Sequence, residues 1–332
     1  MGDNHRDHGA GLTRRQFLTS TALLGGMALM GAPLTWAQAK NRISVATGGT
    51  GGVYYPYGGG IASVISKYLP GVEATAEVTA ASVDNCRLVA AGKADLGFVM
   101  ADSAYDAVTG AGKFKDKLPL MNVAVLYSNF MHVVVTDDKI NSVADLKGKK
   151  VSTGAPGSGT EVKALRVLEA FGIDPDKDIK RDRLGASESA GALKDNKVEA
   201  YFWDGGLPTA SVLDLAATPG TTIKLLPSGE AVSKMVGKYG PVYFPKTIPK
   251  AIYPGMKADV PVAAVANLLL CNQKADPELI YNILKTMFEH HAELVAIHKE
   301  ALHLTLQEAV VGSPIPFHPG AVKFFKEKGA NI

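Results

Sequence analysis

Cysteine, aromatic residues and long apolar runs are all scarce in this chain of 332 residues. Its two cysteines, Cys86 and Cys271, are too few for a disulfide framework and do not define a metal site. Both lie in apolar segments, which predicts buried free thiols, although an oxidising compartment would permit a disulfide. The 35 Lys and Arg nearly balance the 32 Asp and Glu, and no basic cluster with interleaved aromatics occurs, which argues against nucleic acid as a partner.

Common catalytic and cofactor motifs are also missing. The glycine-rich segment 154–161 has no lysine to reach a terminal phosphate and lacks the Gly-x-Gly-x-x-Gly spacing of dinucleotide sites. No Gly-x-Ser-x-Gly elbow occurs, and His290, His291 and His298 lack the His-Glu-x-x-His pattern of zinc enzymes. The acidic residues of 137–138 and 174–178 are typical of turns and helix caps. We therefore expect neither an enzyme nor a bound metal or cofactor.

The N-terminal region has the pattern of an export signal. Arg14 and Arg15 precede a short apolar stretch, 22–30, and small residues at 37–39 provide an Ala-x-Ala cleavage site. This pattern is typical of a twin-arginine signal peptide, which predicts a periplasmic protein; an uncleaved membrane anchor is the alternative. We assign residues 1–38 to the signal and exclude them from the fold. Beyond them, no segment has the length and apolar character of a membrane span.

Two segments share the pattern of a strand, a glycine-rich turn and a helix. The first runs through 43–47, 48–56 and 58–69, and the second through 149–151, 152–161 and 162–171. Free N–H groups and the positive end of the helix dipole meet at such a turn, so each favours an anion, and a small carboxylate fits better than a phosphate. The alternative is a loop that only needs glycines at positive φ and an N-cap.

A weak internal repeat supports two similar lobes. Segments 85–98 and 189–202 share one order of apolar, Gly or Asn, Lys and acidic residues, and each predicts a helix, a tight turn and a buried strand. Coincidence between two ordinary α/β segments is the alternative. With crossings at 120–136 and near the prolines of 241–249, we predict lobe I from 39–135 plus 245–332 and lobe II from 136–244. Helices are expected over 277–308 and 317–328.

Together, four segments resemble the TAXI family of extracytoplasmic solute receptors, which serve tripartite ATP-independent periplasmic (TRAP) transporters. They are 46–56, 94–99, 142–161 and 202–208, in the same order over essentially the whole mature chain. The resemblance implies an α/β, two-lobed periplasmic binding protein of type II-like fold with two crossing hinge strands. It also implies a monomer that binds a small carboxylate or amino acid, such as glutamate, glutamine or 2-oxoglutarate, and delivers it to a membrane permease.

The resemblance also implies the ligand contacts. They come from the first glycine turn, the second helix start, the third strand end, the 156–160 turn and the segment 203–205, namely Gly49, Thr50, Tyr54, Ser82, Asn85, Met100, Asp102, Pro156, Ser158, Gly159, Thr160, Trp203, Asp204 and Gly205. We expect the amides of 154–160 to bind a carboxylate, Tyr54 and Trp203 to wall the cleft, and Asp102 or Asp204 to orient a polar or cationic group.

This chain departs from the family pattern in two places. Met100 and Ala101 stand where relatives often have Gln-Ser, and Asp204 puts an acid where they tend to have a neutral residue. Both changes favour a smaller, less polar or amine-bearing ligand. Two other functions stay open: a receptor of an ATP-driven importer for a sulfonate, nitrate or thiamine precursor, and an exported enzyme with an anion-binding loop.

Overall fold

A computed structural model describes residues 41–332 of the protein, and the predicted export signal, 1–38, lies outside them. Within 41–332 no helix is long and apolar enough to cross a membrane, and no cluster of three or more His, Cys, Asp or Glu side chains could hold a metal ion. Cys86 and Cys271 are both buried and free in this structure.

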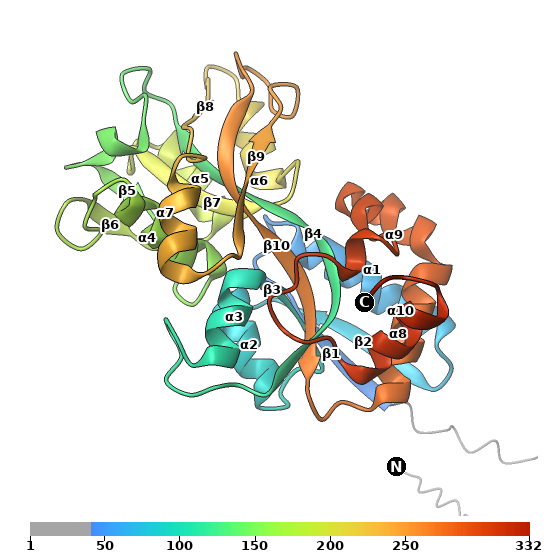
Figure 1. Cartoon of the computed structure of the whole chain (residues 1–332). Coiled ribbons are helices and arrows are strands. Elements are labelled where there is room, and N and C mark those ends of the chain that lie inside the picture. Colours follow the sequence, from blue (N-terminus) through green and yellow to red (C-terminus); the bar gives the residue numbers. More distant parts are fainter. Residues whose placement is uncertain (1–40) are drawn as a thin grey trace, which may run out of the picture. The chain divides into compact units, whose positions relative to one another are not determined.

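The strands expected near 43–47, 120–136 and 149–151 and at the ends of 85–98 and 189–202 are present, and with five further strands they form a single mixed sheet. They are β1 Asn41–Ala46, β2 Val72–Glu77, β3 Leu96–Met100, β4 Leu120–Val135, β5 Lys150–Ser152, β6 Lys180–Asp182, β7 Ala200–Gly205, β8 Lys224–Leu225, β9 Tyr243–Ile248 and β10 Val260–Asn272. Their order is β2-β1-β3-β10-β4-β7-β5-β6, with β8 beside β4 and β9 beside β10 (Figure 1).

The sheet order has an internal symmetry. At one end, β1 lies parallel between β2 and β3, and at the other β5 lies parallel between β6 and β7. The two long strands β10 and β4 run antiparallel to β3 and β7 and to each other. We call β1–β3 with the helices packed on them the first half, and β5–β7 with theirs the second half. The symmetry agrees with the internal repeat seen in the sequence.

The return crossing predicted at 241–249 is wrong. That segment forms β9, which pairs antiparallel with the beginning of β10, from Val260 opposite Ile248 to Val265 opposite Tyr243. The chain returns on β10 itself, because its apolar run continues far enough to pair first with β9 and then with β3. The two crossing strands are therefore β4, as expected, and β10 (Figure 1). The lobe boundaries 39–135 with 245–332 and 136–244 remain a prediction.

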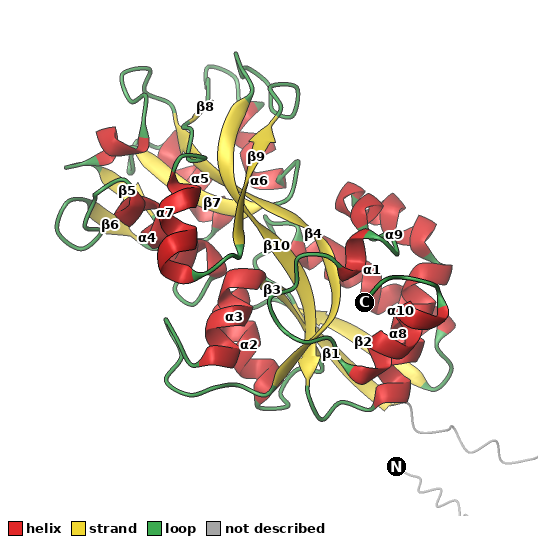
Figure 2. Cartoon of the chain, in the orientation of Figure 1, coloured by secondary structure: helices red, strands yellow, loops and turns green. Residues whose placement is uncertain are grey.

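Helices cover both faces of the sheet (Figure 2). The α-helices are α1 Tyr54–Tyr68, α2 Ser82–Ala90, α3 Ala101–Thr109, α4 Gly159–Ala170, α5 Ala186–Lys194, α6 Ala210–Ala216, α7 Ala231–Tyr239, α8 Pro277–Glu289, α9 His291–Ile297 and α10 Pro319–Glu327. The 3₁₀ turns are η1 Val143–Leu146, η2 Lys299–His303 and η3 Glu308–Val310. The predicted C-terminal helices are thus present, in shorter pieces.

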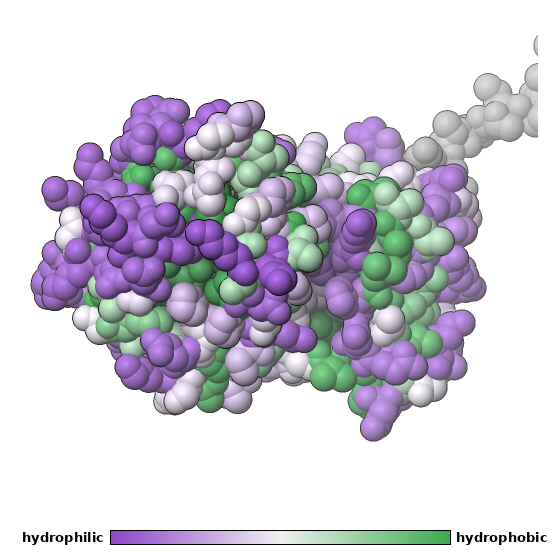
Figure 3. Space-filling view, turned by 90° about the horizontal axis from the view of Figure 1, so that it is seen from above, coloured by the Kyte–Doolittle hydropathy of each residue, from purple (hydrophilic) through white to green (hydrophobic). Residues whose placement is uncertain are grey.

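Apolar burial supports this arrangement. Three clusters of buried side chains pack between the sheet and its helices, and the largest includes residues of both halves, such as Val99 of β3 and Val151 of β5. On the face drawn in Figure 3, hydrophilic residues cover much of the surface and hydrophobic ones gather in smaller groups. The halves therefore share part of one core across the crossing strands.

The second glycine turn leads into α4 through two glycines at positive φ and a serine N-cap. Gly154 and Gly157 have φ of +101° and +83°, a conformation that disfavours side chains. Ser158 then caps the helix, because its Oγ accepts a 3.0 Å hydrogen bond from the N–H of Glu161. The turn thus leaves the N–H groups at the helix start directed out of the helix.

Candidate functional site

The candidate site is a cavity of about 270 Å³ at the starts of four helices, two from each half. Its wall consists of 48–54 before and at α1, 79–82 at α2, 155 and 158–160 at α4, 185–188 at α5, and 100, 127 and 203–205 on strands. Ligands of α/β sheets bind at the carboxyl ends of strands. The carboxyl ends of β3 and β7 both lie in the wall of this cavity.

The starts of α2 and α4 meet from opposite halves. A methyl group built at Gly159 would come within 2.6 Å of Ser82 Oγ and 2.5 Å of Met100 Sδ, so only glycine fits there without a shift. The N–H groups of Ser82, Gly159 and Thr160 have no acceptor among residues 41–332. Unpaired N–H groups at helix starts are donors for an anion.

Two hydroxyl groups add to these donors. Ser82 Oγ accepts a 3.1 Å hydrogen bond from the N–H of Met100, and Thr160 Oγ1 accepts one of 3.3 Å from the N–H of Asp204. Each hydroxyl oxygen is thereby oriented. The Thr160 hydroxyl hydrogen makes no hydrogen bond within 41–332, whereas the Ser82 hydroxyl also lies within hydrogen-bond reach of the Tyr54 hydroxyl. A ligand oxygen near these two residues could accept from both hydroxyls and from the N–H groups beside them.

The aromatic residues Tyr54 and Trp203 both line the cavity. The Tyr54 hydroxyl donates to Asn267 Oδ1 at 2.7 Å, and Trp203 Nε1 donates to Thr209 Oγ1 at 3.0 Å. Both polar groups are therefore used within the protein, and the rings supply apolar surface. A methyl group built at Gly52 would lie 2.9 Å from the Trp203 ring, so Gly52 lets the first glycine turn approach the indole of the other half.

Asp204 lines the cavity, but its side chain is directed into the protein. That side chain has 0% exposure and lies beside the equally buried Lys163, whose Nζ is 2.8 Å from Oδ2. Lys163 also donates to the Ala263 carbonyl at 3.0 Å. Neither Asp204 oxygen has a hydrogen bond of normal geometry, and burial raises the pKa of Asp204 to about 6 while the ammonium of Lys163 opposes this.

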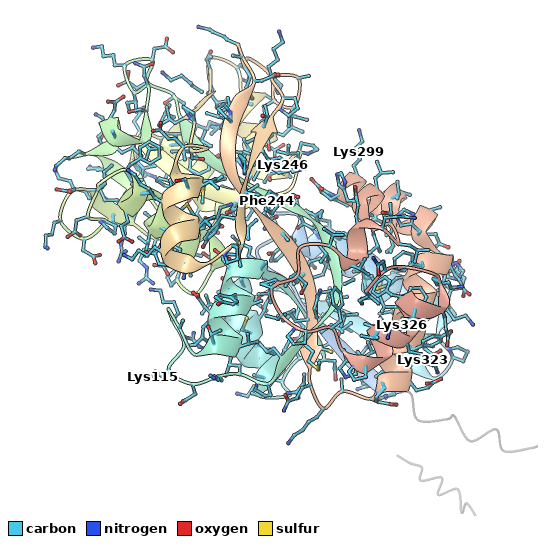
Figure 4. The ribbon with its side chains drawn as sticks, in the orientation of Figure 1. Lys115, Phe244, Lys246, Lys299, Lys323 and Lys326 are labelled. Atoms are coloured by element: carbon cyan, nitrogen blue, oxygen red, sulfur yellow. The ribbon has the colours of Figure 1, made fainter. Side chains whose placement is uncertain are left out.

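Lys163 is unusual among the lysines of this chain. The lysines labelled in Figure 4, such as Lys246, Lys299 and Lys323, lie on the outside of the ribbon and are exposed. Lysine is seldom fully buried unless it is paired. The pairing with Asp204 thus explains how α4 accommodates a buried ammonium group.

Backbone contacts hold the two halves together around the cavity. The Gly157 carbonyl accepts hydrogen bonds from the N–H groups of Val83 and Asp84 at the start of α2, at 3.1 and 3.2 Å. The Gly51 carbonyl accepts one from the N–H of Ser211 in α6, at 3.3 Å. Each glycine turn therefore caps a helix of the opposite half, and the structure is a closed arrangement.

A buried ionic cluster lies between α3 and α4. Arg166 of α4 forms an ion pair with Asp106 of α3, and the same guanidinium donates to the Tyr243 hydroxyl at 2.7 Å. The Tyr243 hydroxyl donates in turn to Asp102 Oδ2 at 2.8 Å. Burial raises the pKa of Asp106, which the charge of Arg166 opposes. The cluster joins the halves through side chains.

Eleven of the predicted contact residues lie in the wall of the cavity: Gly49, Thr50, Tyr54, Ser82, Met100, Ser158, Gly159, Thr160, Trp203, Asp204 and Gly205. The structure brings them together from the first glycine turn, α1, α2 and β3 of the first half and from the start of α4 and β7 of the second, but their contacts with a ligand remain predictions.

Three predicted residues do not line the cavity. Asn85 uses its amide to donate to three carbonyl groups, including those of Thr47 at 2.7 Å and Phe98 at 2.8 Å. Asp102 belongs to the ionic cluster, and Pro156 is an exposed residue of the turn whose neighbour Ala155 lines the wall instead. Their side chains thus support the loops and helices around the site.

Sequence reasoning missed the segment 185–188 at the start of α5, as well as 79–81 and Tyr127. The internal repeat contained a signal for the first of these. The offset that aligns 85–98 with 189–202 also carries Ser82 to Ala186, so the helix start chosen in the first half had a counterpart. Tyr127 could not be found in this way, because it lies within the long strand β4.

Comparison with known proteins gives one family and one fold. A model of the NMT1-like family matches residues 45–329. The chain is 14% identical to MatC from Rhodopseudomonas palustris with bound malate, covering 86% of this chain and 96% of that one with a TM-score of 0.54. It is 16% identical to the alkanesulfonate-binding protein SsuA from Xanthomonas axonopodis pv. citri, covering 87% and 84% with a TM-score of 0.48. The fold is the mixed α/β, two-lobed type II fold of periplasmic binding proteins.

Proposed function

This chain belongs to the NMT1-like family, and from that membership, its fold and its cavity we propose that it is the solute-binding protein of a transporter. The ligand is a small carboxylate or amino acid of the glutamate, glutamine or 2-oxoglutarate type. The protein is a periplasmic receptor of the TAXI type, exported by its twin-arginine signal, and delivers the ligand to the permease of a TRAP transporter.

One observation carries the proposal. The starts of α2 and α4 come from opposite halves and present unpaired N–H groups and the hydroxyl groups of Ser82 and Thr160 to one cavity. A carboxylate bound there would accept from both halves at once, and so would favour the closed arrangement. The resemblance to the TAXI segments supports the carboxylate class and the TRAP permease.

The test is calorimetric titration of the purified protein with carboxylates and amino acids. Thr160→Val removes one hydroxyl and nearly keeps the volume, and Ser82→Ala removes the other. Each variant should weaken binding about 3- to 10-fold, because a lost hydrogen bond contributes roughly 0.5–1.5 kcal/mol. Thr109→Val is the control, since its exposed hydroxyl bonds within α3. Unchanged affinity in both site variants would contradict the proposed site.

A receptor of an ATP-driven importer for a sulfonate is the second candidate. The donors at α2 and α4 suit a sulfonate as well as a carboxylate, since both are oxyanions that accept from N–H and O–H groups. Tighter binding of short alkanesulfonates than of carboxylates of equal length would favour this candidate.

A further inference from the structure

The charged side chains in the cavity wall are both acidic. Asp204 and Glu188 line the cavity, and no Lys, Arg or His lies among the lining residues within 41–332. An anion in this cavity would therefore find N–H and O–H donors in the wall, but no basic side chain.

The two acids differ in their partners. The ammonium of Lys163 lies 2.8 Å from Asp204 Oδ2, and both side chains have 0% exposure, so this charge is balanced behind the wall. Glu188 is exposed, and in the described part of the chain it has neither an ion pair nor a side-chain hydrogen bond. Glu188 thus leaves one uncompensated negative charge at the cavity.

The position of this carboxylate is defined by α5. Glu188 is in the first turn of the helix, and a methyl group built at Gly185, the N-cap residue, would come within 2.4 Å of Glu188 Oε2. Because Gly185 itself lines the cavity, the carboxylate lies next to the wall. The first turns of α2 and α4 also carry an acid, Asp84 and Glu161, but neither lines the cavity, so α5 differs in that its acid does.

We propose that Glu188 is a charge-selecting residue of the cavity: it disfavours a second negative charge on the ligand and favours an ammonium or neutral polar group. This inference rests on the proposed function and narrows its ligand class. One carboxylate binds at α2 and α4, so the preferred ligand is a monocarboxylate with an amine or amide, rather than a dicarboxylate. The effect is electrostatic and acts through a partly hydrated space, so it is modest and screened by salt.

Titration calorimetry of the purified protein with glutamine, glutamate and succinate at low ionic strength tests the selection. The wild type should bind glutamine more tightly than succinate. Glu188→Gln should reduce this preference about 3- to 10-fold, mainly by tighter binding of succinate, and the change should shrink in 0.5 M NaCl. Glu230→Gln is the matched control, because Glu230 is an exposed acid just before α7 and does not line the cavity.

Two results would overturn the inference. If succinate binds the wild type as tightly as glutamine, or if Glu188→Gln changes the preference no more than Glu230→Gln does, Glu188 does not select by charge, while the receptor function stands. If neither the wild type nor the variant binds any of the three compounds, the proposed ligand class fails and the selection fails with it.

Discussion

Helices α1 and α4 occupy equivalent places in the two halves, yet they bury different kinds of side chain. Both follow a glycine turn, and both pack on strands of their own half, α1 on β2 and β1 and α4 on β7. The side chains that α1 buries are mostly apolar or aromatic, with Tyr57 and Ile61 at 0% exposure. In contrast, α4 also buries charged residues, including Lys163 at 0% and Arg166 at 6%.

The strand, glycine turn and helix unit thus occurs with two kinds of helix, one held by apolar packing and one that also forms buried ion pairs. Burial of apolar surface holds α1 on its sheet, with roughly 1.5–3 kcal/mol for each large side chain. The basic side chains of α4 form two ion pairs. Lys163 pairs with Asp204 of its own half, and Arg166 pairs with Asp106 of the other half. Such pairs add little net stability, but breaking them is unfavourable, so they make the arrangement specific.

The largest effect is expected from Lys163→Met. The substitution keeps the length of the side chain but leaves the Asp204 carboxylate buried without its ammonium, which should destabilise the protein by about 3–5 kcal/mol. Urea unfolding measures the loss. The double variant Lys163→Met with Asp204→Asn should recover much of it, and equal losses in the single and double variants would contradict the role of the pair.

A somewhat smaller effect is expected from Arg166→Met. It leaves Asp106 and Asp102 facing each other without a cation in the closed arrangement, whereas opening would return them to water. Closure should weaken by about 3 kcal/mol, seen as a larger radius of gyration in X-ray scattering. Arg183→Met is the control, because Arg183 pairs with Glu161 inside the second half at 2.6 Å and should not open the halves.

The contact between Glu300 of the first half and Leu207 of the second can be tested by its dependence on pH. Its side chain is 4% exposed and accepts a hydrogen bond from the N–H of Leu207 in the second half. Burial raises the pKa of Glu300 to about 7, opposed by the Leu207 N–H and by His303, whose Nε2 is 3.7 Å from Oε2.

The sign of the pH effect follows from that raised pKa. Between about pH 4.5 and 7 the folded protein keeps the Glu300 proton while the unfolded chain loses it, so the contribution to stability falls as pH rises through this range. The loss is about 3 kcal/mol. Glu300→Gln should remove this part of the pH dependence in urea unfolding, and an unchanged slope would contradict the assignment.

The smallest effect is expected on α1. The Tyr57 hydroxyl is buried and has no hydrogen-bond partner within 41–332, so Tyr57→Phe removes an unsatisfied polar group. Stability should change by less than about 1 kcal/mol or increase slightly. A loss comparable to that of Lys163→Met would show that α1 also depends on a polar interaction, and the contrast between the helices would fail.

Much of the fold was predictable because its signals are local. Apolar periodicity and glycine turns predicted β1, α1, β5 and α4 within a few residues. The expected ligand contacts came instead from the resemblance to the TAXI segments. The return crossing was not predictable in this way, because β9 and β10 follow each other along the chain and only pairing across the sheet decides which of them crosses. Asn85 and Asp102 share segments with residues of the wall, and only their hydrogen bonds show that they face elsewhere.

The sequence by itself determined the two strand, turn and helix units and their repetition, because these depend on neighbours along the chain. Only the tertiary structure decided which charges meet. Lys163 and Asp204 lie far apart in sequence, as do Arg166 and Asp106, and their contacts arise from packing of α4 against β7 and α3. The interaction energy of two charges depends on their distance and on their burial, and both are set by the folded structure. The roles of these ion pairs therefore could not be derived from the sequence.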